Sequence, residues 1–433
     1  MIFSKQAVGM LTVVYNCTML LLLIPAQFAL AQSDLPVVRA SSKTVDIRDG
    51  KHFREGYWAI MPERKPDYYY TEIPEKPHTV TFITNLDSIS VDLTYGKEFD
   101  FIILLNGKDS CYTRISARYR NLNTFTRKKT GVESDTIPFR LGDNSKIYLK
   151  GNLNGSQLLD IQLDLGAGGS VIKKASVAKV NMNFDQTTTL HNTDGSNQVP
   201  FSSRNLLQIG DLAWDSVSIA VADNMTHRED LIIGNSLFRN KILEINYDKM
   251  VLVIHDTLPG HATSYCRRDL VLDGGVIPFV EVSLSQGDTK SGWAMFDTGA
   301  YTTILNSQDV PIPYRVLGEL GKMVGSNRNR FIPKLSIANQ EFSGFNYNVQ
   351  DMGKNGLHMI LGNDLLKRFN TILDNRNGYL YMQPNSLIQS PYGRRGEYYL
   401  VMIATGVLLL LTGIVVYRRI RKSKSHKGRV KYV

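Results

Sequence analysis

The sequence predicts a mainly β protein: a small β-domain, then a bilobal β unit, then a single transmembrane helix near the C-terminus. Three observations support this prediction. Runs of about six to eight apolar or alternating residues, bounded by turn residues, are typical of strands and recur along the chain. A pattern that occurs twice within residues 135–385 indicates a duplicated unit. A long uncharged run follows that unit and has the length that a helix needs to cross a bilayer.

Length and charge limit the function classes. The 433 residues are enough for two or three domains, and 43% apolar content is typical of a packed protein. The formal net charge is +10, but eight positive charges follow the last apolar run: Arg418, Arg419, Arg421, Lys422, Lys424, Lys427, Arg429 and Lys431. Removing these eight from +10 leaves +2 for the rest of the chain. This near-neutral balance argues against a nucleic-acid-binding surface.

The N-terminus has the layout of a signal peptide over residues 1–31. Lys5 precedes a mostly apolar stretch that culminates in residues 19–24, and Ala29 and Ala31 form a small-x-small cleavage site. An uncleaved N-terminal anchor is the alternative. The layout indicates that the chain is exported.

Cysteines are few. Removal of a signal peptide would also remove Cys17 and leave Cys111 and Cys266. A disulfide between these two is chemically permitted in an oxidising compartment, but they are far apart in sequence, and both a disulfide and two free thiols stay open. Cys266 stands beside Arg267 and Arg268, yet no convincing base accompanies it. We therefore interpret Cys266 as structural or disulfide-bonded rather than as a nucleophile.

Residues 398–417, "YYLVMIATGVLLLLTGIVVY", are predicted to form a transmembrane helix. They comprise about twenty residues without a charge, and tyrosines mark both ends. A buried core helix is a weaker interpretation, because the basic tail at residues 418–433 follows at once. By the positive-inside tendency the tail is cytoplasmic and the ectodomain is periplasmic or at the cell surface. The tail should also attract anionic lipid. A sorting tail removed after export would have a similar layout and is the alternative.

Residues 32–130 are predicted to form an N-terminal β-rich domain. The runs "HTVTFIT", "SISVDLTY" and "FDFIILLNGKD" are strand-like, and Asn106-Gly107 is a tight-turn dipeptide. A removable inhibitory prosegment is the alternative. The segment "NTFTRKKTGVESD" then reads as a polar linker to the duplicated unit.

The duplicated unit has a first half at residues 135–256 and a second half at residues 268–385. Three markers occur in the same order in both. "TIPF" recurs as "VIPF", "LDLGAGGSVI" recurs as "FDTGAYTTIL", and "LIIGNSLFRNKILEINYD" recurs as "MILGNDLLKRFNTILDNR". Three markers in one order are an unlikely coincidence, so the sequence indicates an internal duplication.

In each half an aspartate ends an apolar strand, at Asp164 and Asp297, and a Gly-Ala turn follows. A lone carboxylate there would be a solvated turn residue, but a pseudo-twofold axis between duplicated halves would bring both turns together. Two carboxyl groups at close range share a proton, so one pKa rises and the other falls. The ionised acid can then deprotonate a water while the protonated acid polarises a scissile carbonyl, without metal or cofactor.

This pattern, with an apolar-apolar-Gly segment later in each half, resembles the retropepsin-like aspartic proteases, while the single-chain, two-lobed layout is like that of pepsin. The resemblance covers about residues 135–385. It implies that Asp164 and Asp297 are the catalytic pair. It implies active-site turns that contain Gly166, Ala167, Thr298, Gly299 and Ala300, and support beneath these turns from Ile233, Gly234, Leu361 and Gly362.

The family also implies a hairpin flap that closes over an extended substrate. Two segments are candidates. One is "HNTDGSNQVPF", with Asp194-Gly195 at its turn, and the other is "GKMVGSNRNRF", with Gly325-Ser326 at its tip.

The first motif departs from the family because Leu165 stands where threonine or serine is expected. The resemblance implies that this hydroxyl bonds across the interface to the opposite turn. Leu165 cannot make that bond, whereas Thr298 can. The missing bond corresponds to about 0.5–1.5 kcal/mol, which would loosen the pair without abolishing it.

Two functions stay open. We favour a membrane-anchored aspartic endopeptidase that cleaves extended peptide segments, because both aspartates and both glycines are present. The alternative is a catalytically inactive, protease-like ectodomain that binds peptides or proteins. We expect a monomer with a peptide or protein partner and no nucleic acid, cofactor or metal. The histidines lack metal-ligand spacing, and there is no phosphate-binding Gly-Lys loop or dinucleotide fingerprint.

Overall fold

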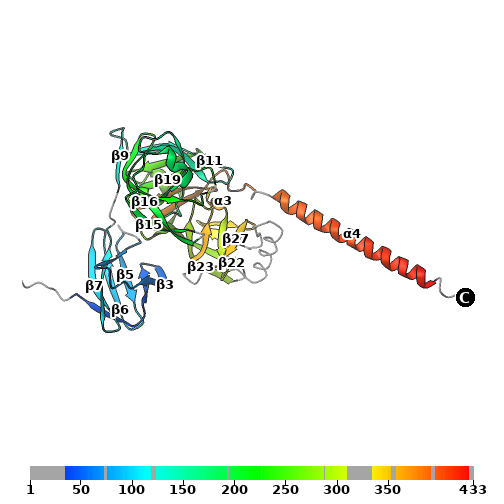
Figure 1. Cartoon of the computed structure of the whole chain (residues 1–433), viewed down its shortest axis with the longest axis horizontal. Helices are drawn as coiled ribbons and strands as arrows, with labels where there is room; N and C mark the ends of the chain where they lie inside the picture. The colour runs from blue at the N-terminus through cyan, green and yellow to red at the C-terminus, as the bar shows by residue number, and fades with distance from the viewer. Residues whose placement is uncertain are drawn as a thin grey trace, which may run out of the picture.

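The computed structural model describes residues 35–72, 76–118, 123–192, 195–225, 227–286, 288–309, 334–352, 357–391 and 395–428. The predicted signal peptide lies outside these residues. The described chain is mainly β, as predicted, and one long helix follows the β domains. Figure 1 shows the N-terminal domain next to the two-lobed unit, with helix α4 (Arg395–Gly428) projecting away from both.

The N-terminal domain contains two sheets, each four-stranded in the described part of the chain, in the orders β1-β7-β8-β4 and β3-β2-β5-β6. The strands are β1 (Val37–Ala40), β2 (Thr44–Asp49), β3 (His52–Ala59), β4 (Asp67–Tyr70), β5 (His78–Ile83), β6 (Ser88–Leu93), β7 (Glu98–Leu105) and β8 (Asp109–Ser116). Their inward side chains, such as Phe82, Phe101 and Ile103, form one fully buried core with the alternation that half-buried strands require. The β7–β8 turn has positive φ at Asn106 and Gly107, as its sequence predicts.

The first half of the two-lobed unit forms a sheet of its own, in the order β11-β12-β13-β18-β14-β17-β16-β15. Its strands are β11 (Arg140–Leu141), β12 (Ile147–Leu153), β13 (Leu159–Leu163), β14 (Ser170–Lys173), β15 (Gln186–Asn192), β16 (Gly195–Ile209), β17 (Leu212–Ala222) and β18 (Leu231–Ile233). Short 3-10 helices η1 (Lys174–Lys179) and η2 (Asn235–Phe238) follow β14 and β18. Strand β9 (Thr124–Arg127), which lies in the predicted polar linker, pairs with β17 and so belongs to this sheet.

The second half has a similar arrangement of strands, and some of its strands also pair with strands of the first half in a shared sheet. Its strands are β21 (Cys266–Asp273), β22 (Ile277–Gln286), β23 (Asp288–Phe296), β24 (Thr303–Asn306), β25 (Lys334–Ile337), β26 (Gln340–Phe342), β27 (Tyr347–Gln350), β28 (Leu357–Leu361), β29 (Phe369–Asp374) and β30 (Tyr379–Pro384), with helix α3 (Asn363–Leu366) after β28. The 3-10 helix η3 (Gly260–Ser264) precedes β21.

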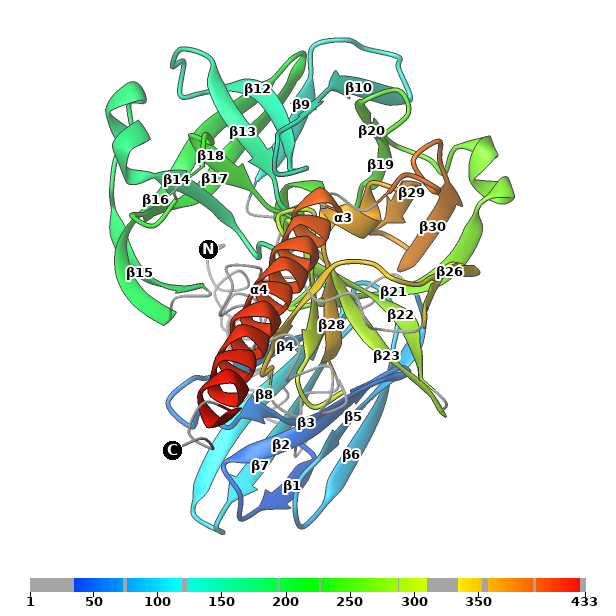
Figure 2. The ribbon, with the colours of Figure 1, turned by 90° about the vertical axis from the view of Figure 1, so that its right-hand side faces the viewer.

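A run of six strands, β10-β20-β19-β29-β30-β21, connects the two halves. The first three, which include β10 (Ser134–Pro138), β19 (Ile242–Asn246) and β20 (Val251–His255), come from the first half, and the last three come from the second. The junction is the antiparallel pair β19–β29, in which Ile242 lies opposite Asp374. Figure 2 shows β20, β19, β29 and β30 side by side. One hydrophobic core therefore extends through both halves.

Two of the three repeated sequence markers occupy equivalent positions in the two halves, and the third does not. Strands β13 and β23 each precede an aspartate turn, and β18 and β28 each precede the Gly-Asn segment. The "TIPF" and "VIPF" markers are not equivalent. Ile137 lies in β10, opposite Leu252 in the shared sheet, whereas Ile277 begins β22, opposite Asp273. This part of the predicted repeat is a chance similarity between two apolar strand segments.

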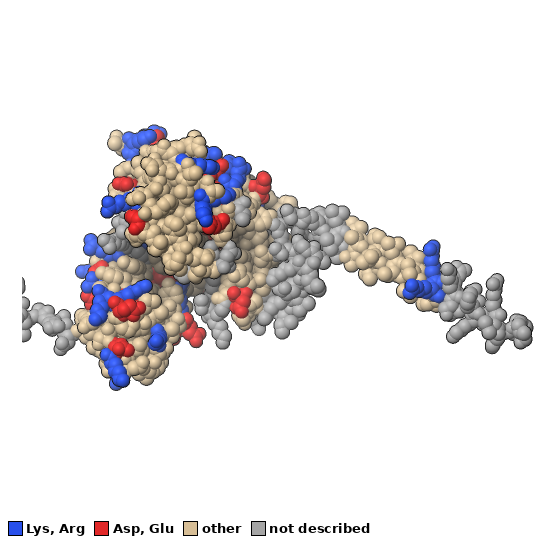
Figure 3. All heavy atoms as spheres, viewed as in Figure 1, with Lys and Arg blue, Asp and Glu red and all other residues tan. Residues whose placement is uncertain are grey.

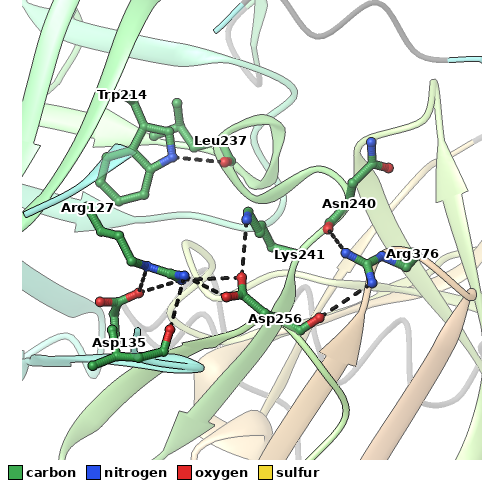
Figure 4. Close-up of polar contacts among 9 residues, drawn as sticks. Arg127, Asp135, Trp214, Leu237, Asn240, Lys241, Asp256 and Arg376 are labelled. Carbon is green, nitrogen blue, oxygen red and sulfur yellow. Dashed lines mark hydrogen bonds and ion pairs between the residues drawn. The ribbon is translucent and has the colours of Figure 1, made fainter. Parts of the chain in front are cut away.

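Side chains near the beginning of the unit connect both halves (Figure 4). The Arg127 guanidinium on β9 contacts the carboxylates of Asp135 and Asp256, at 2.8 and 2.5 Å. Lys241 lies 3.5 Å from Asp256, and Arg376 of the second half donates to the Asp256 backbone carbonyl at 3.4 Å. The linker is therefore fixed to the shared sheet.

The N-terminal domain contacts the second half. The Arg54 guanidinium lies 2.6 Å from the Asp273 carboxylate and 3.4 Å from that of Glu72. The Leu272 backbone N–H donates to the Glu72 carbonyl at 3.0 Å, and the His52 ring packs against Trp293 with centroids 5.3 Å apart. Arg54 and Glu72 are both buried, so both charges are removed from water. Each is therefore stabilised by its oppositely charged partner.

Helix α4 contains the predicted membrane span. An 18-residue window, Ile403–Ile420, has a mean hydropathy of 1.7, and none of it is buried against the rest of the protein. Figure 3 shows an uncharged helix surface that ends in blue Lys or Arg side chains. By length and composition this helix is able to span a membrane.

Candidate active site

Each aspartate follows the last residue of a central strand, Asp164 after β13 and Asp297 after β23. The backbone N–H of Asp164 donates to the Ile233 carbonyl at 2.9 Å, and that of Asp297 donates to the Leu361 carbonyl at 3.1 Å. The acceptors end the parallel neighbours β18 and β28. The sheet of each half thus fixes the start of its turn in the same way.

The glycines after these acceptors allow the turns to pack closely. A Cβ atom on Gly234 would collide with the backbone carbonyl of Ala167. A Cβ atom on Gly362 would lie 2.5 Å from the carbonyl carbon of Thr302. Only glycine fits such a close backbone approach. The structure therefore places the residues named as support directly against the aspartate turns.

The two turns meet at the interface between the halves. A Cβ atom on Gly166 would stand 2.5 Å from the Asp297 carboxyl carbon, and one on Gly299 would collide with the carboxyl group of Asp164. The two carboxyl groups hydrogen-bond to one another. The structure thus brings together two acids that are 133 positions apart in the sequence.

The environments of the two acids differ. Asp297 Oδ1 accepts the backbone N–H groups of Gly299 and Ala300, at 2.7 and 2.9 Å, which stabilise its ionised form. Burial raises the pKa of Asp297 despite these bonds. Burial, and then the neighbouring Asp297 carboxylate, raise the pKa of Asp164 far above its ordinary value. The two N–H donors at Asp297 favour a proton on Asp164 and the ionised form of Asp297.

The hydroxyl of Thr298 connects the two turns. It is fully buried, donates to the Leu163 carbonyl at 3.0 Å and accepts the Leu165 backbone N–H at 3.0 Å. Leu165, also fully buried, is part of the apolar core. The reciprocal hydroxyl contact is thus replaced by apolar packing.

Two asparagines at equivalent positions connect the halves and were not identified from the sequence. Asn235 donates its side-chain amide to the Val276 carbonyl at 2.8 Å, and Asn363 donates to the Ser145 carbonyl. Each asparagine directly follows a glycine of the repeated Gly-Asn segment, and each reaches the loop before the second strand of the other half. Their recurrence in the repeat was the signal that could have revealed them.

The first candidate flap lies in a β-hairpin. Strands β15 and β16 pair from Gln186 opposite Phe201 to Asn192 opposite Gly195, whose φ is 123°. Asp194 at the turn, and both Gly325 and Ser326 of the second candidate flap, lie outside the described residues.

The disulfide that the sequence left open is absent, because both cysteines are free. Cys111 is buried on β8 in the core of the N-terminal domain, whereas Cys266 begins β21 in the shared sheet. The two thiols belong to different packed cores. Burial raises the pKa of Cys111 to about 11, which fits an inert core thiol.

Comparisons with known proteins give a limited result. No protein-family model matches the sequence, and no curated protein is detectably similar to it. Among solved structures, the chain is similar to the crystal structure of an aspartic proteinase from Irpex lacteus. The match has 13% identity and a TM-score of 0.40, and covers 59% of this chain and 99% of that chain.

Proposed function

We propose that this protein is an aspartic endopeptidase held at a membrane by helix α4. The observation that carries the proposal is the pair of mutually hydrogen-bonded carboxyl groups on Asp164 and Asp297, in turns of equivalent construction. Two carboxyl groups that share a proton supply a base and an acid within reach of one water.

The asymmetry of the pair assigns a role to each acid. Ionised Asp297 takes a proton from a water molecule as its oxygen attacks the scissile carbonyl carbon, and Asp164 gives its proton to the carbonyl oxygen. The resulting gem-diol breaks down when Asp297 returns its proton to the amide nitrogen. The C–N bond then breaks, and a diol hydroxyl proton goes back to Asp164. No covalent intermediate forms.

The substrate class in this proposal is an extended peptide or an unfolded protein segment. The β15–β16 hairpin has the form of a flap, and its backbone could pair with an extended chain as an added strand would. The retropepsin-like affiliation stays a prediction, and so does the extracytoplasmic side of the ectodomain.

The test uses a peptide library of unbiased sequence and the purified full chain in detergent, from acidic to neutral pH. Wild-type protein should cleave, and Asp164→Asn and Asp297→Asn should each reduce cleavage by at least about a hundredfold. Asp223→Asn is the control, because this exposed carboxylate pairs with Lys174 on the surface. Cleavage that persists in both active-site variants would contradict the proposal.

A binding function is the second candidate, and the absence of a hydroxyl at Leu165 favours it. If the folded wild-type chain cleaves no peptide at any pH, the endopeptidase proposal fails. Capture of peptides from the same library by this uncut protein would then support a peptide-binding ectodomain.

A further inference from the structure

A buried glutamine contacts the acid pair from one side. Gln162 lies on β13 two residues before Asp164, so both side chains project from the same face of the strand. Gln162 is fully buried. Its Nε2 atom lies 3.4 Å from Asp164 Oδ2, and its Oε1 atom lies 3.4 Å from Lys146 Nζ. The amide therefore links a lysine to the acid that carries the shared proton.

The loop between β11 and β12 fixes the backbone of Lys146. The Gly142 N–H donates to the Lys146 carbonyl at 2.9 Å, and the Lys146 N–H donates to Asn144 Oδ1 at 3.2 Å. The preceding residue, Ser145, has a φ of 58°, which few residues other than glycine adopt.

Helix α3 of the second half holds the same loop. Asn363 donates to the Ser145 carbonyl, and Lys367 Nζ lies 2.9 Å from the Ser145 hydroxyl. Lys146 thus follows a residue that is bonded across the interface. Its distance from the acid pair depends on how the two halves are joined.

The second half lacks this arrangement. Val276 accepts Asn235 there as Ser145 accepts Asn363, so Ile277 stands where the first half has Lys146. Met295 precedes Asp297 by two residues, as Gln162 precedes Asp164. Neither Ile277 nor Met295 can reproduce the polar link. The duplication therefore became asymmetric at the acid pair.

We propose that Lys146 and Gln162 are positioning residues that set the pH range in which the acid pair works and orient Asp164 toward Asp297. This inference rests on the proposed peptidase function. Gln162 donates to Oδ2 of Asp164, and this contact fixes the orientation of the carboxyl group. Lys146 holds the Gln162 carbonyl and places a positive charge near both acids.

The charges around the pair are consistent with this role. The Lys146 ammonium lowers the pKa of both Asp164 and Asp297, against the larger effect of burial. Two other charged groups at α3 have partners of their own: Asp364 on the helix accepts the Thr303 hydroxyl, and Lys367, directly after the helix, contacts the Ser145 hydroxyl of the loop. Removal of Lys146 should therefore raise the pKa of both acids.

The first experiment measures kcat/KM against pH. In Lys146→Met both limbs of the profile should move to higher pH, by about half a unit or more, because a nearby positive charge is lost. Lys146→Arg keeps the charge and should restore the wild-type limbs. Lys150→Met, which removes an exposed lysine of β12 that pairs with Asp160 on β13, is the matched control. Gln162→Leu should lower kcat about tenfold or more with little change in KM, since the link orients an acid that acts in the transition state.

A second readout needs no catalysis. The unfolding free energy is measured against pH with and without Lys146→Met, in wild-type and Asp164→Asn backgrounds. Acids whose pKa is raised by folding make stability fall as pH rises toward the folded pKa. In the otherwise wild-type protein, Lys146→Met should make the unfolding free energy continue to fall to higher pH. In the Asp164→Asn protein, Lys146→Met should shift this fall by a smaller amount.

The outcomes separate the two proposals. A wild-type chain without peptidase activity overturns the proposed function, while the stability curves still decide the role of Lys146. An active chain whose pH limbs and stability curves are the same in Lys146→Met and Lys150→Met overturns the inference and leaves the peptidase intact.

Discussion

Leu165 and Thr298 occupy the corresponding position in the two turns, and the structure explains how the pair tolerates their difference. Thr298 satisfies both the Leu163 carbonyl and the Leu165 N–H, while Leu165 fills the core. A leucine side chain that is fully buried contributes more than one hydrogen bond does.

We therefore expect Leu165→Thr, although it restores the sequence pattern of the resembled family, to destabilise the protein by about 1–2 kcal/mol, because the cavity outweighs one regained bond. Urea unfolding measures this change, and Leu165→Met is the control that keeps the volume. A higher free energy of unfolding in Leu165→Thr would contradict this prediction and show that Leu165 is less stabilising than threonine at this position.

Thr298→Val should be costly despite the similar shape of the two side chains. It leaves the Leu163 carbonyl and the Leu165 N–H buried without their partner, at about 1–3 kcal/mol. Catalysis should fall as well, because both turns lose their connection. Thr298→Ser keeps the hydroxyl and should stay close to wild type in urea unfolding and in kcat. Equal stability of the valine and serine variants would contradict this role.

Asp364 gives a pH-dependent prediction away from the acid pair. Burial raises its pKa to about 6, although it accepts the Thr303 N–H and hydroxyl. Its unfolded pKa is about 3.9, so the folded state binds the proton more tightly. The resulting stabilisation is complete below about pH 4 and is lost as pH rises through about 6. Asp364→Asn should remove this part of the decline in the unfolding free energy. An unchanged decline would show that Asp364 does not titrate in this range.

The Gly-Asn segments after β18 and β28 each connect one half to a loop of the other. We expect Asn235→Ala and Asn363→Ala to destabilise the protein by similar amounts, about 1–3 kcal/mol each, because each removes the side-chain donor to a backbone carbonyl of the opposite half. Both variants should also reduce kcat, since the halves present the acids jointly. Asn154→Ala is a control from the first half alone, where Asn154 bonds to Asn205. If only one of the two substitutions has a large effect, the two asparagines contribute unequally to stability although their positions are equivalent.

The sequence identified the elements that depend on local pattern. Strands with a period of two, the Asn106-Gly107 turn and the apolar helix are coded by consecutive residues, and the duplication pointed to both aspartate turns. Features that depend on pairing between strands distant in the sequence were not predicted. Strand β9 looked like a linker because three of its four residues are polar, and only the pairing with β17 makes it a strand.

The site was also incomplete for a physical reason. Lys146 lies in the loop before β12 and Gln162 lies on β13, and no repeat marks them because the second half has Ile277 and Met295 instead. Cys111 and Cys266 looked like a pair only because no other cysteine remains after the signal peptide. Cys111 is buried in the core of the N-terminal domain, whereas Cys266 is half-buried against the core of the two-lobed unit. Likewise, "TIPF" and "VIPF" matched in letters while lying in strands with different neighbours.

The contact between the N-terminal domain and the second half should be sensitive to loss of one charge. Asp273→Ala leaves the Arg54 guanidinium with Glu72 alone, in a mostly buried place. We expect a loss of about 1–3 kcal/mol and faster hydrogen exchange in β3 and β21. Asp211→Ala, which removes the exposed partner of Lys129, should change neither. Unchanged exchange in Asp273→Ala would indicate that apolar contacts such as His52 with Trp293 suffice.

Helix α4 should decide where the protein is found in a cell. The full chain should stay with membranes through high-salt and alkaline washes, and a chain that ends at residue 391 should be soluble. The reason is the exposed apolar surface of residues 403–420, which has no partner in the described protein. Release of the full chain by alkaline wash alone would contradict a membrane span.

The shared sheet has a consequence for synthesis on the ribosome. Strand β19 is made well before β29, its partner, so a nascent chain that ends within the second half carries an unprotected sheet border. About 125 residues must be added before that border closes, which takes roughly 6 to 25 seconds at about 5–20 residues per second. During this interval a chaperone, or a neighbouring nascent copy, has the first opportunity to occupy the place of β29.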